Sequence, residues 1–149
     1  MQFFKEGHKR NYAHFQQQRD LILRAFPSFK CDVYRNVLSC RAKIVPSECC
    51  ATYSVLISYR FRDSPHVAIT NPSIPKELWP FVHIFPKSGE LCLFDCRPEG
   101  QPWHWMNNIH ETIIPWTAEW LVYYELFLKV GRWLGPEVKH VKPKVSGGK

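Results

Sequence analysis

The sequence predicts an α+β fold with an N-terminal helix, an antiparallel meander sheet, a long ordered loop and C-terminal helices. Three patterns predict it: helical spacing of apolar residues near the N-terminus, two-residue alternation in the middle of the chain, and an aromatic stripe at helical spacing near the C-terminus. A chain of 149 residues is long enough for one domain, and it contains no internal repeat or dividing linker. We expect residues 1–140 to form this domain and residues 141–149 to form a flexible basic tail.

The first predicted element is an amphipathic helix over residues 11–26. Its apolar residues recur three and four positions apart, interrupted by Arg19: Tyr12, Phe15, Ile22 and Phe26. Asn11 is a favoured type of N-cap residue, and Pro27 ends the helix because proline cannot continue it.

Three strands of a meander follow this helix. Residues 38–44 and 52–62 alternate apolar and polar side chains, the pattern of a strand with one buried face. Residues 66–70 form a shorter third strand. Proline-containing turns at residues 46–47 and 63–65 separate the strands, so we expect consecutive strands to pair antiparallel.

The stretch from residue 71 to residue 102 is predicted to be a long loop. Six prolines exclude long regular elements there: Pro72, Pro75, Pro80, Pro86, Pro98 and Pro102. Large apolar residues between them argue against disorder: Trp79, Phe81, Ile84, Phe85, Leu91 and Leu93. We therefore expect an ordered, packed loop, and such a loop inside a compact domain is usually functional.

A helix is predicted to begin at Pro115, a favoured first helical residue, and to end at Gly131. Its apolar residues form a wide aromatic stripe: Trp116, Trp120, Tyr123 or Tyr124, Phe127 and Val130. Packing in the core is the favoured interpretation of this stripe, and a partner-binding face is the alternative.

Composition narrows the class of protein. Hydrophobic residues make up 45% of the chain and charged residues 22%, as in a globular protein, and no apolar run is long enough to span a membrane. The N-terminus has no apolar run like that of a signal peptide, so we expect a cytoplasmic protein. The six cysteines contain no Cys-x-x-Cys pair; we therefore expect reduced thiols, no metal and no cofactor.

The net charge of +7 raises the question of a nucleic-acid partner. Much of the excess lies near the C-terminus, at Lys129, Arg132, Lys139, Lys142, Lys144 and Lys149. These residues are not interleaved with aromatic residues in a recognisable motif, so the pattern favours nucleic-acid binding only weakly.

Cys92 and Cys96 are the candidates for chemistry. Cys92 follows a glycine-containing turn at residues 87–90 and lies between two leucines, which would hold its thiol in place beside the long loop. Cys96 is next to Arg97, whose charge favours a thiolate. Local sequence alone leaves the choice open and also allows Cys92 to be a buried apolar side chain.

The wider pattern resembles the ubiquitin-conjugating (UBC-fold) enzymes. In that family a His-Pro-Asn motif lies about ten residues before a catalytic cysteine in a Gly-x-Ile-Cys-Leu segment. Here His83 precedes Cys92 by nine residues, and residues 89–93 read Gly-Glu-Leu-Cys-Leu. The resemblance covers about residues 10–135, implies a UBC-like fold with the long loop as its active-site loop, and selects Cys92 over Cys96 as the catalytic residue.

A closer resemblance is to the UBC-like proteins of bacterial cyclic-oligonucleotide-based anti-phage signalling systems (CBASS), of the short stand-alone type. It rests on His83-Ile-Phe, Gly89 to Leu93, Trp103 and Trp105, Pro-Trp-Thr-Ala-Glu-Trp-Leu at 115–121, and Gly-Arg-Trp-Leu-Gly at 131–135. It implies that Cys92 carries the C-terminus of a cGAS/DncV-like nucleotidyltransferase as a thioester, which a lysine amine of a target protein then attacks. His83 is expected to fix the loop by hydrogen bonding rather than to act as a general base.

One position departs from the ubiquitin-conjugating pattern. Phe85 occupies the place of the asparagine associated with oxyanion stabilisation in that family, so other donors are needed. His104, Asn107, Asn108 and backbone N–H groups near Cys92 are the candidates. This departure keeps open a non-catalytic UBC variant that only binds a nucleotidyltransferase, although the presence of Cys92 argues against it.

Overall fold

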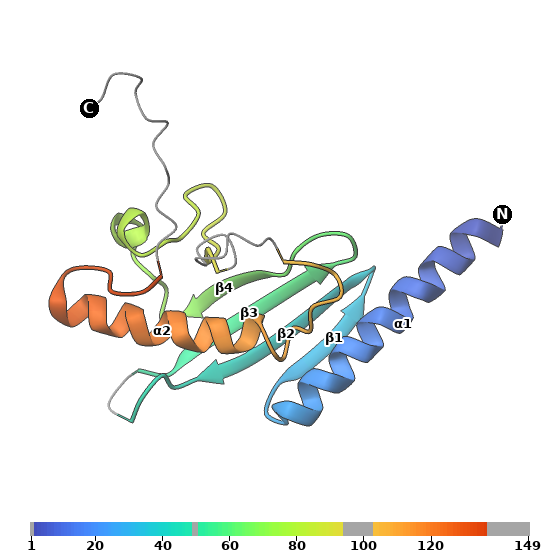
Figure 1. Ribbon diagram of the computed structural model, residues 1–149, viewed down its shortest axis with the longest axis horizontal. Helices are drawn as coiled ribbons and strands as arrows, with labels where there is room; N and C mark the ends of the chain where they lie inside the picture. The colour runs from blue at the N-terminus through green and yellow to red at the C-terminus, as the bar shows by residue number, and fades with distance from the viewer. Residues whose placement is uncertain (1, 49–50, 94–102, 137–149) are drawn as a thin grey trace, which may run out of the picture.

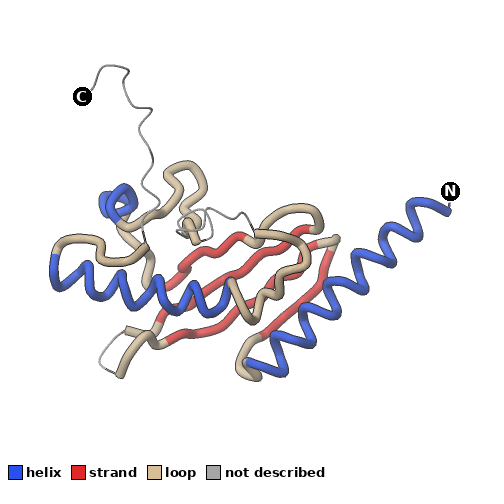
Figure 2. The backbone as a smooth tube through the Cα atoms, in the orientation of Figure 1, coloured by secondary structure: helices blue, strands red, loops and turns tan. Residues whose placement is uncertain are grey.

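The computed structural model describes residues 2–48, 51–93 and 103–136, with the backbone alone for residues 2–10. Helices and strands occur in the order α1 (Gln2–Ala25), β1 (Lys30–Tyr34), β2 (Val37–Ile44), β3 (Tyr53–Arg60), β4 (His66–Asn71), the 3₁₀ helix η1 (Lys76–Phe81) and α2 (Ile113–Val130). The predicted α+β order of elements is confirmed, and it is compatible with a UBC-like fold (Figures 1 and 2). The predicted tail and Cys96 lie outside the described residues.

The four strands form one antiparallel sheet in the order β1-β2-β3-β4. Strand β1 is an addition to the predicted meander. Its sequence, Lys-Cys-Asp-Val-Tyr, gives little apolar alternation, and only Cys31 is buried. The two-residue turn to β2 uses Arg35 and Asn36, both at positive φ (49° and 61°), so it lacks the glycine that usually signals such a hairpin.

Helix α1 is longer than predicted, because it begins at Gln2 rather than after Asn11. Asn11 therefore lies within the helix and is not its N-cap. Residues 2–10 include glutamine, lysine, glutamate and arginine, which are good helix formers and allow the helix to extend without an apolar stripe. The helix ends at Ala25, before Pro27 as predicted, and it runs beside β1 (Figure 1).

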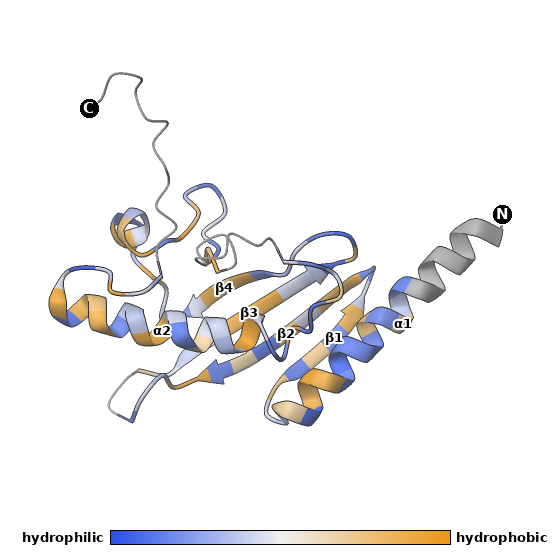
Figure 3. Cartoon of the chain, in the orientation of Figure 1, coloured by the Kyte–Doolittle hydropathy of each residue, from blue (hydrophilic) through white to orange (hydrophobic). Residues whose placement is uncertain are grey.

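Helix α2 crosses the sheet and covers one of its faces (Figure 1). Buried and less buried positions alternate along β2 and β3, and Figure 3 shows apolar residues within the strands of the sheet. The buried residues of these two strands are Leu38, Cys40, Tyr53, Val55, Ile57 and Tyr59. The hydroxyl of Tyr53 donates a hydrogen bond to Glu125, which joins β3 directly to α2.

The aromatic stripe of α2 packs mainly in the core. Trp120 and Tyr124 are buried with their rings stacked at 5.3 Å, and Trp116 and Phe127 are partly buried against the same core. The helix begins at Ile113, two residues earlier than predicted, with Thr112 as N-cap. Pro115 fits within the first turn because the first N–H groups of a helix have no intrahelical partner. Within residues 103–136 this is the one α-helix, and Gly131 ends it with φ 84° as predicted.

Candidate active site

Residues 83–92 form a small antiparallel hairpin that brings the two predicted site residues opposite each other. The backbone N–H of Cys92 donates to the carbonyl oxygen of His83 at 2.9 Å, and Ile84 pairs with Leu91 as an isolated bridge. Two further backbone bonds of 2.9 Å close the turn, from Phe85 N–H to Glu90 and from Gly89 N–H to Phe85. His83 and Cys92, nine positions apart in the sequence, are therefore in direct backbone contact.

Hydrogen bonds from the sheet side and from the α2 side attach this 83–92 hairpin to the rest of the protein. The N–H of Leu91 donates to the carbonyl oxygen of Val67 at 2.9 Å, which adds the hairpin to the edge strand β4. On the α2 side, the indole N–H of Trp120 donates to the carbonyl oxygen of Val82 at 2.9 Å in a buried position. The hairpin is thus held from the sheet and from α2 together.

The turn of the hairpin requires glycine at position 89. Gly89 has φ 73°, which L-residues with a side chain rarely adopt, and a Cβ there would lie 2.9 Å from the ring of Trp79. Trp79 is itself fixed, because its indole N–H donates to the carbonyl oxygen of Ile74 at 2.9 Å. Gly89, the glycine of the motif around Cys92, therefore permits close packing of the turn on η1.

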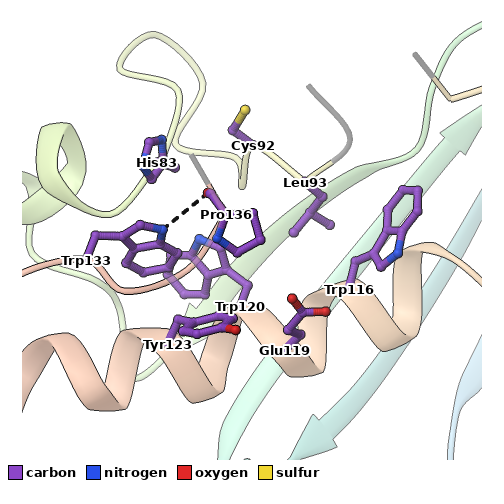
Figure 4. Close-up of a pocket in the computed structure, with 9 residues that line it drawn as sticks. All are labelled: His83, Cys92, Leu93, Trp116, Glu119, Trp120, Tyr123, Trp133 and Pro136. Carbon is purple, nitrogen blue, oxygen red and sulfur yellow. Dashed lines mark hydrogen bonds between the residues drawn. The ribbon is translucent and has the colours of Figure 1, made fainter. Parts of the chain in front are cut away.

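Aromatic side chains from α2 and the segment after it form a wall behind Cys92. Figure 4 shows the Cys92 side chain directed away from Trp120 and Trp133, with the His83 ring on the same side of this wall as the thiol. The His83 ring contacts that of Trp133 at 5.5 Å between centroids. Cys92 is 8% exposed. The cavity between the hairpin and the wall measures about 20 Å³, enough for one water molecule and too small for a cofactor.

Of the candidate oxyanion donors, the structure assigns Asn108 a different bond. Its side-chain N–H, the group that an oxyanion would need, is directed to the carboxylate of Glu111 at 3.5 Å. Its side-chain oxygen accepts from the amide of Gln18 in α1 at 3.0 Å, and Gln18 in turn accepts the backbone N–H of Ile109 at 3.0 Å. The ring of His104 accepts the N–H of Met106 at 3.2 Å. His104, Asn107 and Asn108 are not among the residues that line the cavity beside Cys92.

Gln18 is a residue that the sequence patterns did not single out. Its side chain is 1% exposed, and its amide joins α1 to the segment before α2. The signal was present, because Gln18 lies three residues after Phe15 and four before Ile22, on the apolar stripe of α1.

A second group that the sequence patterns missed is a charged cluster that includes Glu90, two residues before Cys92. His66, the first residue of β4, contacts the carboxylate of Glu90 through Nδ1 and that of Asp63 through Nε2, the latter at 3.0 Å. Burial alone would lower the pKa of His66, but the hydrogen bond to Asp63 and the charge of Glu90 outweigh it and raise that pKa above 6.5. Sequence alone gave no sign that His66 and Glu90 would meet.

Two further thiols face each other on the sheet. Cys31 and Cys40 are buried free cysteines and partners in the β1–β2 register. The hydrogen bond from the Cys40 thiol favours the thiolate of Cys31 and lowers its pKa, whereas the same bond, together with burial, raises the pKa of Cys40. Within the described residues, no group of three or more His, Cys, Asp or Glu side chains could hold a metal ion. Among these same residues, no helix is both long and apolar enough to cross a membrane.

Comparison with known proteins identifies the family. A family model described as Type II CBASS E2 protein matches residues 18–141, which is most of the chain. The matched range includes His83, the 83–92 hairpin and all of α2. No curated protein matches the chain.

Proposed function

The chain belongs to the family of Type II CBASS E2 proteins, and from this we propose that Cys92 is the residue that carries an acyl group during a conjugation reaction. The acyl group is the C-terminal carboxyl group of a cGAS/DncV-like nucleotidyltransferase, and the acceptor is a lysine amine of a target protein. The reaction takes place in the bacterial cytoplasm. No cofactor is needed, because the energy for amide formation resides in the thioester.

The observation that carries the proposal is the position of Cys92 in the 83–92 hairpin. Its backbone N–H is bonded to His83, and the preceding residue is bonded to β4. A thiol attached to such a doubly anchored backbone holds its position while two large substrates exchange an acyl group on it, which is a contribution of positioning.

The proposed reaction has two acyl-transfer steps, formation of a thioester on Cys92 and formation of an amide on the target lysine. The Cys92 thiolate attacks the carbonyl carbon of an activated carboxyl group, the C–S bond forms, and the activating group leaves with the electron pair of its bond. In the second step the lysine amine attacks the thioester carbon, the C–N bond forms, the Cys92 thiolate leaves, and the amine loses a proton to solvent. Both tetrahedral intermediates place negative charge on oxygen, so N–H donors near Cys92 are needed.

His83 acts in this proposal as a residue that fixes the hairpin. Its carbonyl oxygen accepts the N–H of Cys92 at 2.9 Å, and its ring packs on Trp133. Its φ of 59° is in the left-handed region, so the backbone at this position is held by its surroundings.

A second candidate is favoured by the burial of Cys92. With 8% of its surface exposed, the cysteine also fits a non-catalytic UBC variant that binds a nucleotidyltransferase through its surface and leaves the thiol unused.

The decisive experiment supplies the activated carboxyl group directly. A peptide with the C-terminal sequence of the nucleotidyltransferase encoded beside this protein is prepared as a thioester of a small thiol and mixed with the protein. Exchange onto Cys92 releases the small thiol and adds the peptide mass, and a reductant containing a free thiol removes that mass again. We expect the wild-type protein and Cys96→Ala to gain the peptide, and Cys92→Ala to remain unmodified.

The outcomes separate the candidates. Equal modification of Cys92→Ala and wild type would contradict the catalytic role of Cys92, and loss in Cys96→Ala alone would assign the role to Cys96. Tight binding of the intact nucleotidyltransferase without any transfer would favour the non-catalytic variant.

A further inference from the structure

We propose that His66 is a positioning residue for Cys92: with Asp63 and Glu90 it forms a clamp that ties the cysteine's hairpin to β4, and the clamp loosens when His66 loses a proton. This inference rests on the proposed function, because it assigns regulation to the same site. The side chains of His66, Asp63 and Glu90 together make up the His66 clamp.

The clamp joins two pairs of consecutive residues. The side chain of His66 contacts the side chain of Glu90, and the backbone carbonyl of Val67 accepts the N–H of Leu91 at 2.9 Å. Residues 66 and 67 of β4 are thus attached to residues 90 and 91, and Cys92 is the next residue along the chain. Because Glu90 and Leu91 are consecutive, the contact at Glu90 restricts the movement of the backbone that makes the bond to Val67.

The third member fixes the position of His66. Asp63, in the turn between β3 and β4, contacts Nε2 of His66 at 3.0 Å and also accepts the backbone N–H of Ser64 at 2.8 Å. The imidazole therefore lies between two carboxylates that come from different segments of the chain.

This arrangement depends on a proton. A protonated imidazole donates from both nitrogens and satisfies both carboxylates, whereas a neutral imidazole has one N–H and leaves one carboxylate without a donor. Loss of the proton therefore breaks the bond to Glu90 or the bond to Asp63, and in either case the hairpin is held less firmly.

The surrounding groups favour the protonated form. The titratable and charged groups around His66 are Asp63, Glu90 and, acting through Asp63, Arg60 at the end of β3; its partner across the sheet is Ser58, which does not titrate. Burial opposes the charge of His66, but the two carboxylates outweigh it, so the pKa lies above 6.5. The stabilisation is fully present below 6.5 and is lost as the pH rises through the raised pKa.

The test measures the hairpin directly. Hydrogen exchange of the Leu91 and Cys92 N–H groups is followed in wild type, His66→Gln and Glu90→Gln on both sides of the His66 transition, each corrected for the intrinsic pH dependence of exchange. Below the transition we expect both variants to exchange roughly two- to fivefold faster than wild type, because a part-exposed charged contact contributes only a modest stabilisation. Above it, wild type is expected to approach the variants.

Asp32→Asn is the matched control. It also removes a carboxylate from a charged pair, with Arg41 at 3.6 Å, but on β1, at the opposite edge of the sheet from β4. We expect it to leave exchange at Leu91 and Cys92 unchanged. A faster exchange in Asp32→Asn equal to that in Glu90→Gln would overturn the clamp, since charge removal anywhere would then have the same effect.

The pH profile of peptide transfer to Cys92 gives the second readout. The ratio of wild-type to His66→Gln rates is expected to fall toward one as the pH rises through the His66 transition. A constant ratio, together with equal exchange in both proteins, would refute the clamp even if Cys92 accepts the peptide. If wild type accepts no peptide while exchange still depends on His66, the proposed function fails and the clamp remains.

Discussion

The sheet and the 83–92 hairpin share one apolar core, but the hairpin also depends on individual polar contacts to distant residues. In β2 and β3, nearly every second side chain packs in a continuous apolar core, so many similar contacts together stabilise the strands. The hairpin contributes fewer side chains to this core, Ile84 and Leu91, and it has in addition single hydrogen bonds or charged contacts to distant partners: Val67 in β4, Trp120 in α2 (through Val82, just before the hairpin) and His66 at the start of β4.

This difference separates stability from function. Removing apolar volume beneath the sheet weakens the entire protein, because the core is shared by α1, α2 and all four strands. Removing one bond to the hairpin leaves that core intact and changes the position of Cys92. Substitutions in the sheet should therefore mainly change the free energy of unfolding, and substitutions at the hairpin contacts should mainly change hydrogen exchange and peptide transfer at Cys92.

The largest expected effect comes from the sheet. Ile57→Ala in β3 removes a side chain that is 1% exposed, and such truncations cost about 2 to 5 kcal/mol because a cavity remains. We expect the free energy of unfolding in urea to fall by this amount, while the folded fraction still transfers peptide to Cys92 at the wild-type rate. A transfer rate that falls with no loss of stability would contradict the separation of the two regions.

The sheet was largely predictable because its pattern is local. Two-residue alternation in residues 38–44 and 52–62 reports which face is buried without any knowledge of the partner. Strand β1 was missed for the same reason, since Lys30–Tyr34 has only Cys31 as a fully buried residue. The lengths of α1 and α2 were also misjudged, because Asn11 and Pro115 are compatible with more than one position in a helix.

The site was predictable only in part. The importance of His83 and Cys92 was predicted from the resemblance to a family. The structure adds that a backbone hydrogen bond joins the two residues. The contact of His66 with Glu90 joins residues 24 positions apart, and that of Trp120 with Val82 joins residues 38 apart. Pairings of this kind depend on the tertiary fold, and no periodicity in the sequence encodes them.

The next largest effect is expected from the α2 side of the hairpin. Trp120→Phe removes the N–H that bonds the buried carbonyl of Val82, and an unsatisfied buried acceptor costs about 1 to 3 kcal/mol. Because Val82 precedes His83, we expect faster hydrogen exchange at Cys92 and slower peptide transfer. The loss of transfer should exceed what the unfolded fraction explains.

Trp103→Phe is the control for this change. Trp103 is also buried, and its indole N–H donates to Thr112 at 3.2 Å, away from the hairpin. The same atoms are removed in both variants, so a comparable loss of stability is expected by denaturation. Equal slowing of peptide transfer in both would show that α2 supports the site only through overall stability.

Two glycines at positive φ give the sharpest test of the comparison, and Gly131→Ala is expected to have the smallest effect on stability. Gly89→Ala and Gly131→Ala both place a side chain at positive φ, which costs about 1 to 2 kcal/mol. At Gly131 the added Cβ meets nothing within 4 Å, whereas at Gly89 it lies 2.9 Å from the ring of Trp79. Relief of that contact requires the turn of the hairpin or the Trp79 ring to move.

Both variants carry the cost of positive φ, but Gly89→Ala also carries the cost of the Trp79 contact, so it should be the less stable of the two and should differ from Gly131→Ala at Cys92. We expect Gly89→Ala to slow peptide transfer and to raise hydrogen exchange at Leu91, and Gly131→Ala to do neither. If Gly131→Ala slows transfer as much as Gly89→Ala does, the end of α2 and the turn of the hairpin are coupled. The position of Cys92 would then depend on the shared core, as the strands do, because a change at the end of α2 would alter that position while every hydrogen bond of the hairpin stayed intact.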